Sequence, residues 1–257
     1  MLDLFDLGGR TAIVTGGSRG LGLVIAETLG RAGANLVIAA EDECEVGAAG
    51  RSLGELGISV AALRCDVRIR ADQERLVAAA VERFGGLDIL VANAGIPGPT
   101  TGSLSFDPDA YARTFDVNLH SIVALSGLTA PHLRARGGGS IILMASLAGL
   151  RGNRALGAYS LTKAALSQLA RNLAVELGAD NVRVNAIAPG FIRTDLAAPL
   201  LADAAFMARR MQMTPLRRAG EPTEVAGVAL LLASRAGGFI TGQTIVVDGG
   251  TLISDGT

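Results

Sequence analysis

The chain has little of what metal centres and disulfide frameworks require: two cysteines and two histidines among 257 residues. Cys44 and Cys65 stand alone, with no CxxC pair and no ligand spacing around them. We therefore interpret both as ordinary thiols of a reducing compartment. His120 and His132 fit no ligand pattern either, and hydrogen-bonded or helix-surface roles explain them better. The sequence predicts no metal site.

An excess of charge of one sign is also missing. The chain has 23 Lys and Arg against 24 Asp and Glu, so it lacks the basic surplus typical of nucleic-acid-binding proteins and polybasic membrane patches. The uncharged run 117–133 contains polar residues and a proline, whereas a spanning helix needs roughly 18 or more apolar residues. The first six residues are acidic where a signal peptide is basic. We expect a cytoplasmic protein without nucleic-acid or membrane partners.

Lysine is the scarcest charged residue. Lys163 is the single lysine among 23 basic residues, and it follows Tyr159, one of two tyrosines, by four positions. Residues i and i+4 share one helix face, so the phenol and the ammonium would lie side by side. A neighbouring cation lowers a tyrosine pKa from roughly 10 and makes the phenol a usable general acid and base. The alternative is an amphipathic helix with a chance lysine on its exposed side.

Short β-rich runs alternate with helical patterns along the whole chain, and most runs are apolar throughout, as in strands covered on both faces. This alternation predicts an α/β fold, a doubly wound parallel seven-stranded sheet, in a single domain over residues 1–257. The expected strands are 11–15, 35–39, 59–63, 89–92, 140–144, 183–188 and 244–247. The expected helices lie near 21–32, 71–84, 107–135, 157–177 and 221–234. A helix after residue 42 is doubtful, because Gly47, Gly50, Gly54 and Gly57 weaken it.

The first expected strand leads into Thr15-Gly16-Gly17-Ser18-Arg19-Gly20-Leu21-Gly22, directly before a helix. Glycines at such a turn let the backbone approach a pyrophosphate, which lies at the helix N-terminus where N–H groups are unpaired. The spacing G-x-x-x-G-x-G differs from the usual dinucleotide fingerprint. The turn predicts a cofactor site, and the alternative is a tight connection without a ligand.

Acidic residues follow the second and third expected strands. Glu41 and Asp42 come about 20 residues after the glycines, where a carboxylate commonly binds the adenosine ribose. The alternative for this pair is a solvated helix N-terminus. Asp66 and Val67 either reach the adenine or cap the following turn.

Further polar signals lie at the carboxyl ends of later strands, the edge at which doubly wound sheets bind ligands. Asn93-Ala94-Gly95 ends the fourth strand, so its turn would meet the glycine turn at one crevice. Ser146 ends the fifth strand, and Pro189-Gly190 and Thr194 follow the sixth. Asn118 lies in a long helical pattern and needs hydrogen-bond partners if it is buried.

Together these motifs resemble the short-chain dehydrogenase/reductase family over nearly the whole chain. The resemblance implies a Rossmann-like sheet of order 3-2-1-4-5-6-7 and an NAD(P)-dependent oxidoreductase that interconverts secondary alcohols and ketones. It also implies a homotetramer, or a homodimer, built on the helices near 107–135 and 157–177. The matching elements are Thr15–Gly22, Asp66, Asn93–Gly95, Asn118, Ser146, Tyr159-x-x-x-Lys163, Pro189-Gly190 and Val247–Gly250.

The resemblance implies roles for individual residues as well. Tyr159 would exchange a proton with the substrate oxygen, and Lys163 would lower its pKa and bind the nicotinamide ribose. Ser146 would polarise the substrate oxygen, and Asn118 would hold a proton-relaying water. The residues assigned to the cofactor are Gly16, Ser18, Arg19, Gly20, Leu21, Gly22, Glu41, Asp66, Val67, Asn93, Ala94, Gly95, Tyr159, Lys163, Pro189, Gly190, Ile192 and Thr194. Those assigned to the substrate are Ser146, Leu147, Ala148, Asn153, Tyr159 and Phe191.

The substrate stays open among ketones, 3-oxoacyl (ACP or CoA) groups and sugar acids. Residues 191–215 are expected to form a flexible lid, and the alternative is a surface helix pair without a binding role. The apolar character of this segment favours a hydrophobic or mixed ketone, although Arg209 and Arg210 could hold a carboxylate. A dinucleotide-binding module without catalysis is the alternative from another class, and the intact catalytic set argues against it.

The choice of cofactor rests on two opposed signals. Arg19 occupies a position where NADP-dependent members of the family often carry a basic residue. Glu41 and Asp42 would repel a 2′-phosphate, because like charges a few ångströms apart cost about 1 kcal/mol or more. We expect a modest preference for NAD(H) over NADP(H).

Overall fold

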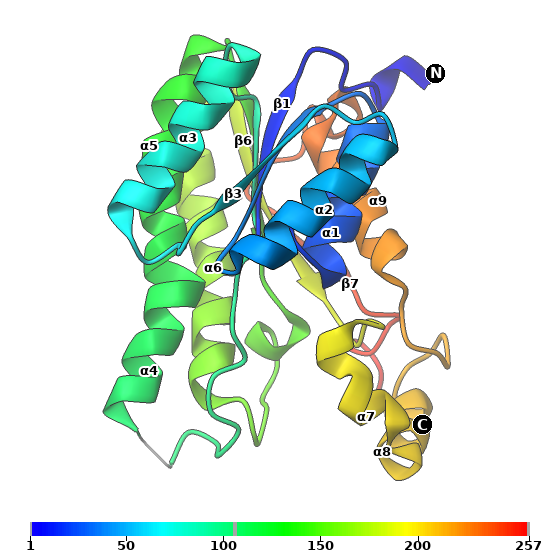
Figure 1. Ribbon diagram of the computed structural model, residues 1–257. Helices are drawn as coiled ribbons and strands as arrows, with labels where there is room; N and C mark the ends of the chain where they lie inside the picture. Colours follow the sequence, from blue (N-terminus) through cyan, green and yellow to red (C-terminus); the bar gives the residue numbers. More distant parts are fainter. Residues whose placement is uncertain (1, 105–106, 256–257) are drawn as a thin grey trace.

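The computed structural model describes residues 2–104 and 107–255. Within them, seven parallel strands form one sheet of order β3-β2-β1-β4-β5-β6-β7 (Figure 1). The strands are β1 (Thr11–Thr15), β2 (Asn35–Ala40), β3 (Val60–Arg64), β4 (Ile89–Ala92), β5 (Gly139–Met144), β6 (Val182–Pro189) and β7 (Thr244–Val247). The predicted fold class and strand order are confirmed, and each expected strand differs from the observed one by no more than one residue at either end.

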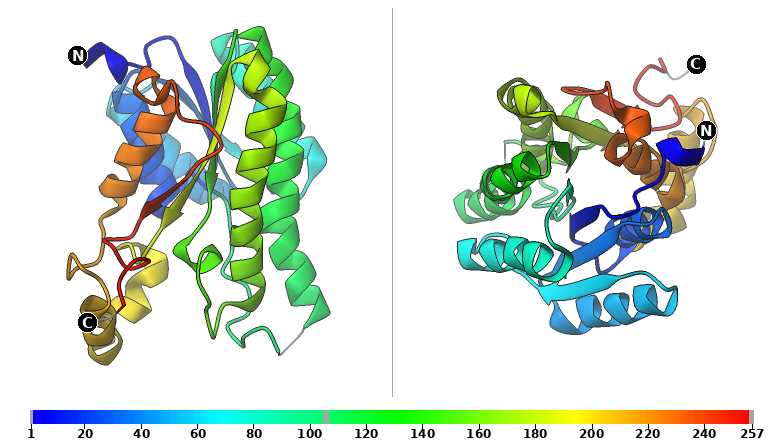
Figure 2. Two further views of the ribbon diagram at one scale, coloured as in Figure 1. Left: turned by 180° about the vertical axis from the view of Figure 1, so that it is seen from behind. Right: turned by 90° about the horizontal axis from the view of Figure 1, so that it is seen from above.

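Helices cover both faces of the sheet (Figure 1 and Figure 2). One layer contains α1 (Gly20–Arg31), α2 (Glu43–Glu55) and α9 (Pro222–Ala233). The other contains α3 (Arg70–Phe84), α5 (Ser121–Ala135) and α6 (Gly157–Leu177). In addition, α4 (Pro108–Phe115) precedes α5, and α7 (Ala198–Ala202) and α8 (Ala204–Gln212) follow β6. None of the helices in the described ranges is long and apolar enough to cross a bilayer.

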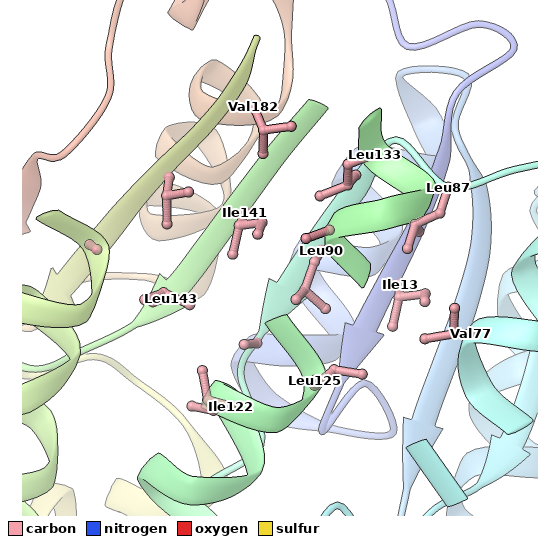
Figure 3. Packing of buried hydrophobic residues seen from close by; sticks show 14 of the residues in the cluster. Ile13, Val77, Leu87, Leu90, Ile122, Leu125, Leu133, Ile141, Leu143 and Val182 are labelled. Carbon is pink, nitrogen blue, oxygen red and sulfur yellow. The ribbon is translucent and has the colours of Figure 1, made fainter. Parts of the chain in front are cut away.

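Two hydrophobic cores lie between the sheet and its helical layers. Ile13 of β1 packs toward α3 and α5, whereas its neighbours Ala12 and Val14 pack toward α1 and α9, because successive side chains of a strand point to opposite faces. Figure 3 shows the first core, in which Leu90 and Ile141 from adjacent strands are fully buried. Each such side chain contributes about 1.5–3 kcal/mol to the free energy of unfolding.

The doubtful helix after residue 42 is present, as α2. Its buried face includes Val46 and Leu53, which pack against the sheet. At Gly50 a Cβ would lie 2.6 Å from the Cβ of Ala62 in β3. The glycine therefore allows close packing between helix and strand, and this packing outweighs its poor helix propensity.

The single helix expected over 107–135 is interrupted. Between α4 and α5 the chain forms one π-helical turn, η2 (Asp116–His120), which contains Asn118. Such turns are rare and occur frequently at functional sites. Hydrophobic periodicity gave no sign of it, because the apolar pattern continues across the turn.

The carboxyl ends of all seven strands lie at one edge of the sheet, near which α7 and α8 are placed (lower part of Figure 1). Residues 191–215 leave this edge after β6 and return to it: Thr214 Oγ1 lies 3.0 Å from Thr251 Oγ1, beyond β7. The candidate site is built at this edge.

Candidate active site

The turn between β1 and α1 is the first part of the site. Gly16 has φ +63°, a left-handed conformation that favours glycine, and a Cβ there would lie 2.9 Å from Asn93 Nδ2. A Cβ on Gly22, in the first turn of α1, would collide with the carbonyl oxygen of Gly16. The geometry of the turn itself therefore requires glycine at both positions.

The N-terminus of α1 has room for a ligand. Its N-cap residue, Arg19, is extended and makes no side-chain capping bond, so the first N–H groups of the helix lack a side-chain partner. A Cβ added to Gly20 would meet no atom within 4 Å, which shows free space beside these N–H groups. The arrangement fits a dinucleotide pyrophosphate, because a helix N-terminus combines unpaired donors with a favourable dipole.

The turns after β1 and β4 are bonded to each other. Asn93 Nδ2 donates to the carbonyl oxygens of Thr15 and Gly16, at 3.0 and 3.1 Å. Thr15 Oγ1 accepts from the backbone N–H groups of Asn93 and Ala94, at 3.0 and 3.1 Å. The structure thus brings the two turns together, and the Asn93 side chain is used to hold the glycine turn. The part played by the Thr15 hydroxyl had no sequence signal.

Arg68 lies beside the acidic residues that follow β2 and β3 and interacts with their carboxylates. Its Nη2 lies 2.6 Å from Asp66 Oδ2 and 3.8 Å from Glu41 Oε1. Side-chain hydrogen bonding from Arg68 holds the pKa of Asp66 below its ordinary value. Asp66 also accepts from the Arg68 backbone N–H, so it caps its own turn, while the Val67 carbonyl accepts from Gln73. No motif in the sequence singled out Arg68.

Asp42 and Arg19 make local contacts with α2. Asp42 caps the helix and accepts from the Glu45 N–H at 2.9 Å. Arg19 Nε lies 3.6 Å from Glu45 Oε2, and Ser18 Oγ donates to the same oxygen at 3.3 Å. The Glu41 side chain is 66% exposed. Of the acidic pair, Asp42 is thus a helix cap and Glu41 remains accessible to a ligand.

Tyr159 and Lys163 lie one turn apart near the start of α6. Lys163 Nζ is 5.5 Å from the centre of the Tyr159 ring and donates to the carbonyl oxygen of Met144, at the end of β5, over 2.6 Å. Ser146 lies two residues beyond Met144, and its side chain hydrogen-bonds Tyr159. The phenol, the hydroxyl and the ammonium therefore meet at the carboxyl end of β5.

The pKa of Tyr159 does not shift in the direction expected from the sequence. Burial raises it, and the hydrogen bond with Ser146 opposes this only in part. Burial also lowers the pKa of Lys163 from 10.5 to about 8. The expected lowering of the tyrosine pKa by the lysine is wrong for this structure, because desolvation dominates and the ammonium is bonded to Met144. The phenol keeps its proton at neutral pH.

Asn118 is fully buried, and its amide links three segments. Oδ1 accepts from the Ile96 N–H at 2.8 Å, and Nδ2 donates to the Ile96 carbonyl at 2.9 Å and to Thr162 Oγ1 at 3.3 Å. A Cβ on Gly95 would lie 3.3 Å from Asn118 Oδ1 and 3.5 Å from Lys163 Nζ. Both side chains therefore lie against the turn after β4. Sequence reasoning did not identify Ile96 or Thr162 as partners.

The segment after β6 adds aromatic side chains to this edge. The Phe191 ring is 5.5 Å from that of Phe206 in α8, and the Arg210 guanidinium lies 5.7 Å over the Phe191 ring. Ile192 is buried and pairs with Gly220 in an isolated bridge.

The other predicted positions lie in the segments that follow β5 and β6. Gly190 packs against Asp248, since a Cβ there would be 2.6 Å from the Asp248 Cβ, and Thr194 precedes the short helix η5 (Asp195–Ala197). Leu147 is buried and Ala148 half-buried, in the short helix η3 (Leu147–Gly149). Asn153 Oδ1 accepts from the backbone N–H groups of Ala155 and Leu156, so this oxygen shapes the loop before α6. Among the described residues no group of three or more His, Cys, Asp or Glu could hold a metal ion.

A family model described as Enoyl-(Acyl carrier protein) reductase matches residues 16–251. Dehydrogenase/reductase SDR family member 4 of Oryctolagus cuniculus is 39% identical over 245 residues, which cover 95% of this chain and 94% of that protein. The chain therefore belongs to the short-chain dehydrogenase/reductase family. Membership makes it an oxidoreductase of a family that acts on CH–OH groups.

Solved structures of the family agree closely with this one. A 7α-hydroxysteroid dehydrogenase complexed with NADH and 7-oxo glycochenodeoxycholic acid has a TM-score of 0.92 at 36% identity, over 96% of both chains. A gluconate 5-dehydrogenase from Burkholderia cenocepacia J2315, in complex with NADP and tartrate, also has a TM-score of 0.92, at 34% identity over 98% of this chain and 99% of that one. Relatives of this fold thus include both NADH and NADP complexes.

Proposed function

We propose that the protein interconverts a secondary alcohol and a ketone by hydride transfer to or from a nicotinamide cofactor, with Tyr159 as the proton-transfer group. The observation that carries this proposal is the meeting of Tyr159, Ser146 and Lys163 at the carboxyl end of β5. The glycine turn and the turn after β4 lie at the same edge. A proton donor and a second hydrogen-bond donor beside a cofactor cradle are what carbonyl reduction requires.

Each side chain has a distinct part in the proposed reaction. The bound cofactor supplies the hydride for reduction or accepts it in oxidation. Tyr159 Oη donates its proton to the substrate oxygen in reduction and takes it back in oxidation. Ser146 Oγ donates a hydrogen bond to the same oxygen and holds it against the phenol. Because burial raises the pKa of Tyr159, the phenol is in the protonated form that reduction uses.

Lys163 and Asn118 support the phenol. The Lys163 ammonium lies beside the Tyr159 ring and is held by the Met144 carbonyl, and it binds the nicotinamide ribose. Asn118 holds the turn after β4 against α6 through its hydrogen bonds with Ile96 and Thr162. In the proposed reaction it also holds a water that relays protons. The cofactor and substrate positions assigned from the sequence remain part of this proposal.

The substrate we propose is a hydrophobic or mixed ketone. Support comes from the Phe191–Phe206 pair beside the carboxyl end of β6. A 3-oxoacyl (ACP or CoA) group and a sugar acid are the alternatives within the same reaction, and the relatives named above include a steroid enzyme and a gluconate enzyme. A dinucleotide-binding module without catalysis is the alternative outside it.

For the cofactor we propose a modest preference for NAD(H). Glu41 keeps an exposed carboxylate that can accept bonds from ribose hydroxyls. Arg19 lies near Glu45 and does not contact Glu41, while Arg68 lies 3.8 Å from Glu41 and offsets part of its charge. The Arg68 guanidinium near this carboxylate keeps the discrimination small. A higher kcat/KM with NADP(H) at fixed salt would show that the arginines outweigh Glu41.

We also propose a homotetramer, or a homodimer, assembled through α5 and α6. Val123, Leu161 and Val175 are exposed apolar side chains on these helices, as expected of surfaces covered by another subunit. Sedimentation velocity would test the assembly. A cytoplasmic location is in accord with Cys44 and Cys65, which are both free thiols.

The central experiment is a spectrophotometric screen of NAD(H) and NADP(H) against a panel of alcohols and ketones. Tyr159→Phe removes the transferable proton and should lower kcat by about 100- to 10,000-fold. Tyr111→Phe, at the other tyrosine, is the matched control and should keep wild-type turnover. Tight cofactor binding without turnover of any panel member would favour the non-catalytic module, and full activity of Tyr159→Phe would refute the assigned role.

A further inference from the structure

Two arginines, Arg151 and Arg210, belong to separate segments that follow β5 and β6. Arg151 follows η3, the short helix that begins directly after Ser146. Arg210 lies in the last turn of α8, with its guanidinium 5.7 Å over the ring of Phe191. The two are close enough for the charge of Arg151 to act on Arg210. One arginine thus belongs to the segment beside the proton-transfer residues and the other to the segment after β6.

The Arg210 guanidinium has a nitrogen whose hydrogen-bond acceptor is missing among the described residues. Its Nε is buried, and none of the described residues accepts a hydrogen bond from it. Burial and the charge of Arg151 hold the pKa of Arg210 below its ordinary value, and Asp248 opposes this in part. Asp248, however, accepts from the backbone N–H groups of Gly250 and Leu252, so its oxygens are engaged in their own turn. A buried donor without an acceptor is costly and rare.

Other arginines near this edge differ from this pair. Arg193 pairs with Glu221 at 3.0 Å, and Arg218 pairs with Glu224 at 2.6 Å. Arg209, the neighbour of Arg210, is exposed. Only at Arg210, among these four, is a guanidinium partly buried against an aromatic ring with a donor left over. The missing partner is therefore an acceptor that none of the described residues supplies.

We propose that Arg151 and Arg210 form an anion subsite that holds a carboxylate of the substrate, with the reacting carbonyl placed toward Tyr159. This rests on the proposed function and narrows its substrate class to oxo acids and the corresponding hydroxy acids. A carboxylate would accept from Arg210 Nε in the planar, two-pronged manner that suits a guanidinium. It would also neutralise two like charges, and the Phe191 and Phe206 rings would contact the carbon chain between the two ends.

The test compares oxo acids with their own methyl esters, which keep the same carbon skeleton, add one methyl group and carry no charge. Suitable pairs are acetoacetate, 4-oxopentanoate, 5-oxohexanoate and 7-oxooctanoate with their esters. We expect the wild type to reduce at least one acid with a higher kcat/KM than its ester. Arg210→Met and Arg151→Gln should lower kcat/KM for that acid by about 10- to 100-fold, the worth of a hydrogen bond to a charged group, and leave the ester unchanged.

Matched controls are Arg209→Gln, beside Arg210, and Arg154→Gln, beyond Arg151; both side chains are exposed, and both variants should behave as wild type. Equal use of acid and ester by the wild type, or equal losses for both in Arg210→Met, would overturn the anion subsite and leave the proposed function standing. Failure to reduce any ketone would instead refute the proposed function. In that event, calorimetric titration of the wild type and of Arg210→Met with the same pairs of acid and ester tests the subsite. The subsite requires that the wild type binds an acid but not its ester, and that Arg210→Met no longer binds the acid.

Discussion

Burial of the Lys163 ammonium should lower the free energy of unfolding, and a neutral side chain at this position should raise it again. The side chain is 4% exposed, and its one hydrogen bond in the described structure goes to the Met144 carbonyl. Replacement by methionine, of similar length and no charge, removes the desolvated cation without opening a large cavity. The perturbation to study is therefore Lys163→Met in the protein without added cofactor.

The size and sign of the effect follow from the pKa. Burial lowers the pKa of Lys163 from 10.5 to about 8, so the charged form is destabilised in the folded state by about 3 kcal/mol at pH 7. Between pH 8 and 10.5 the unfolded chain binds more protons than the folded one, so the stability of the wild type rises with pH. By pH 10 the penalty has fallen to about 1 kcal/mol.

The lost hydrogen bond to Met144 works in the opposite direction. It is worth about 1 kcal/mol and does not depend on pH, because a neutral amine can donate it as well. We therefore expect Lys163→Met to be about 2 kcal/mol more stable than wild type at pH 7 and about equal to it at pH 10.

Urea unfolding of both proteins at pH 7 and 10, at one protein concentration, measures this difference. Tyr159→Phe is the control: burial raises the pKa of that phenol, so its stability difference from wild type should change by less than about 0.5 kcal/mol over the same range. A difference between Lys163→Met and wild type that is constant from pH 7 to pH 10 would refute the reasoning, because it would mean that the buried lysine titrates as it does in water.

Three further predictions concern other parts of the site. Lys163→Arg should stay folded by circular dichroism and lose about 100-fold or more in kcat; wild-type turnover at any pH would contradict the role of a compact charge. Gly22→Ala should lower the free energy of unfolding by about 1–3 kcal/mol in urea, because its Cβ would collide with the Gly16 carbonyl. The control Gly54→Ala, which meets no atom within 4 Å, should be neutral or stabilising. In hydrogen exchange without substrate, amides of α7 and α8, in which no described residue is buried, should exchange faster than those of β5 and slow when ligands bind; equal protection would rule out a lid over 191–215.

The sheet could be predicted closely from the sequence because its signal is local. Strands such as β4 are apolar runs between polar or glycine-rich turns, and such a run reports burial on both faces. The helix α2 was the element that the sequence predicted least well, since helix propensity alone penalises Gly50. The close packing of Gly50 against Ala62 of β3 explains why glycine is favourable there. The π turn at Asn118 was not predictable either, because an extra residue in a helical turn leaves the apolar pattern intact.

The site was less accessible to such reasoning, because its partners are distant in the chain. Thr15 and Asn93 bond across 78 positions, and Asn118 and Thr162 across 44. The i,i+4 spacing placed Tyr159 beside Lys163 correctly, but it carried no information on how deeply the helix face is buried. Desolvation therefore reversed the expected direction of the tyrosine pKa.

The single lysine of an arginine-rich chain is explained by the same burial. Among the described residues, Lys163 Nζ has one hydrogen-bond acceptor, the Met144 carbonyl, and the Gly95 turn lies close by. An ammonium is small enough to lie there, and the pKa near 8 shows that lysine can release its proton when the charge becomes too costly. A guanidinium stays charged and carries five donors in a rigid plane, so it would leave more donors unsatisfied in the same space. Arginine is acceptable on the surface of this protein, where water completes its hydrogen bonds, and unsuitable at position 163.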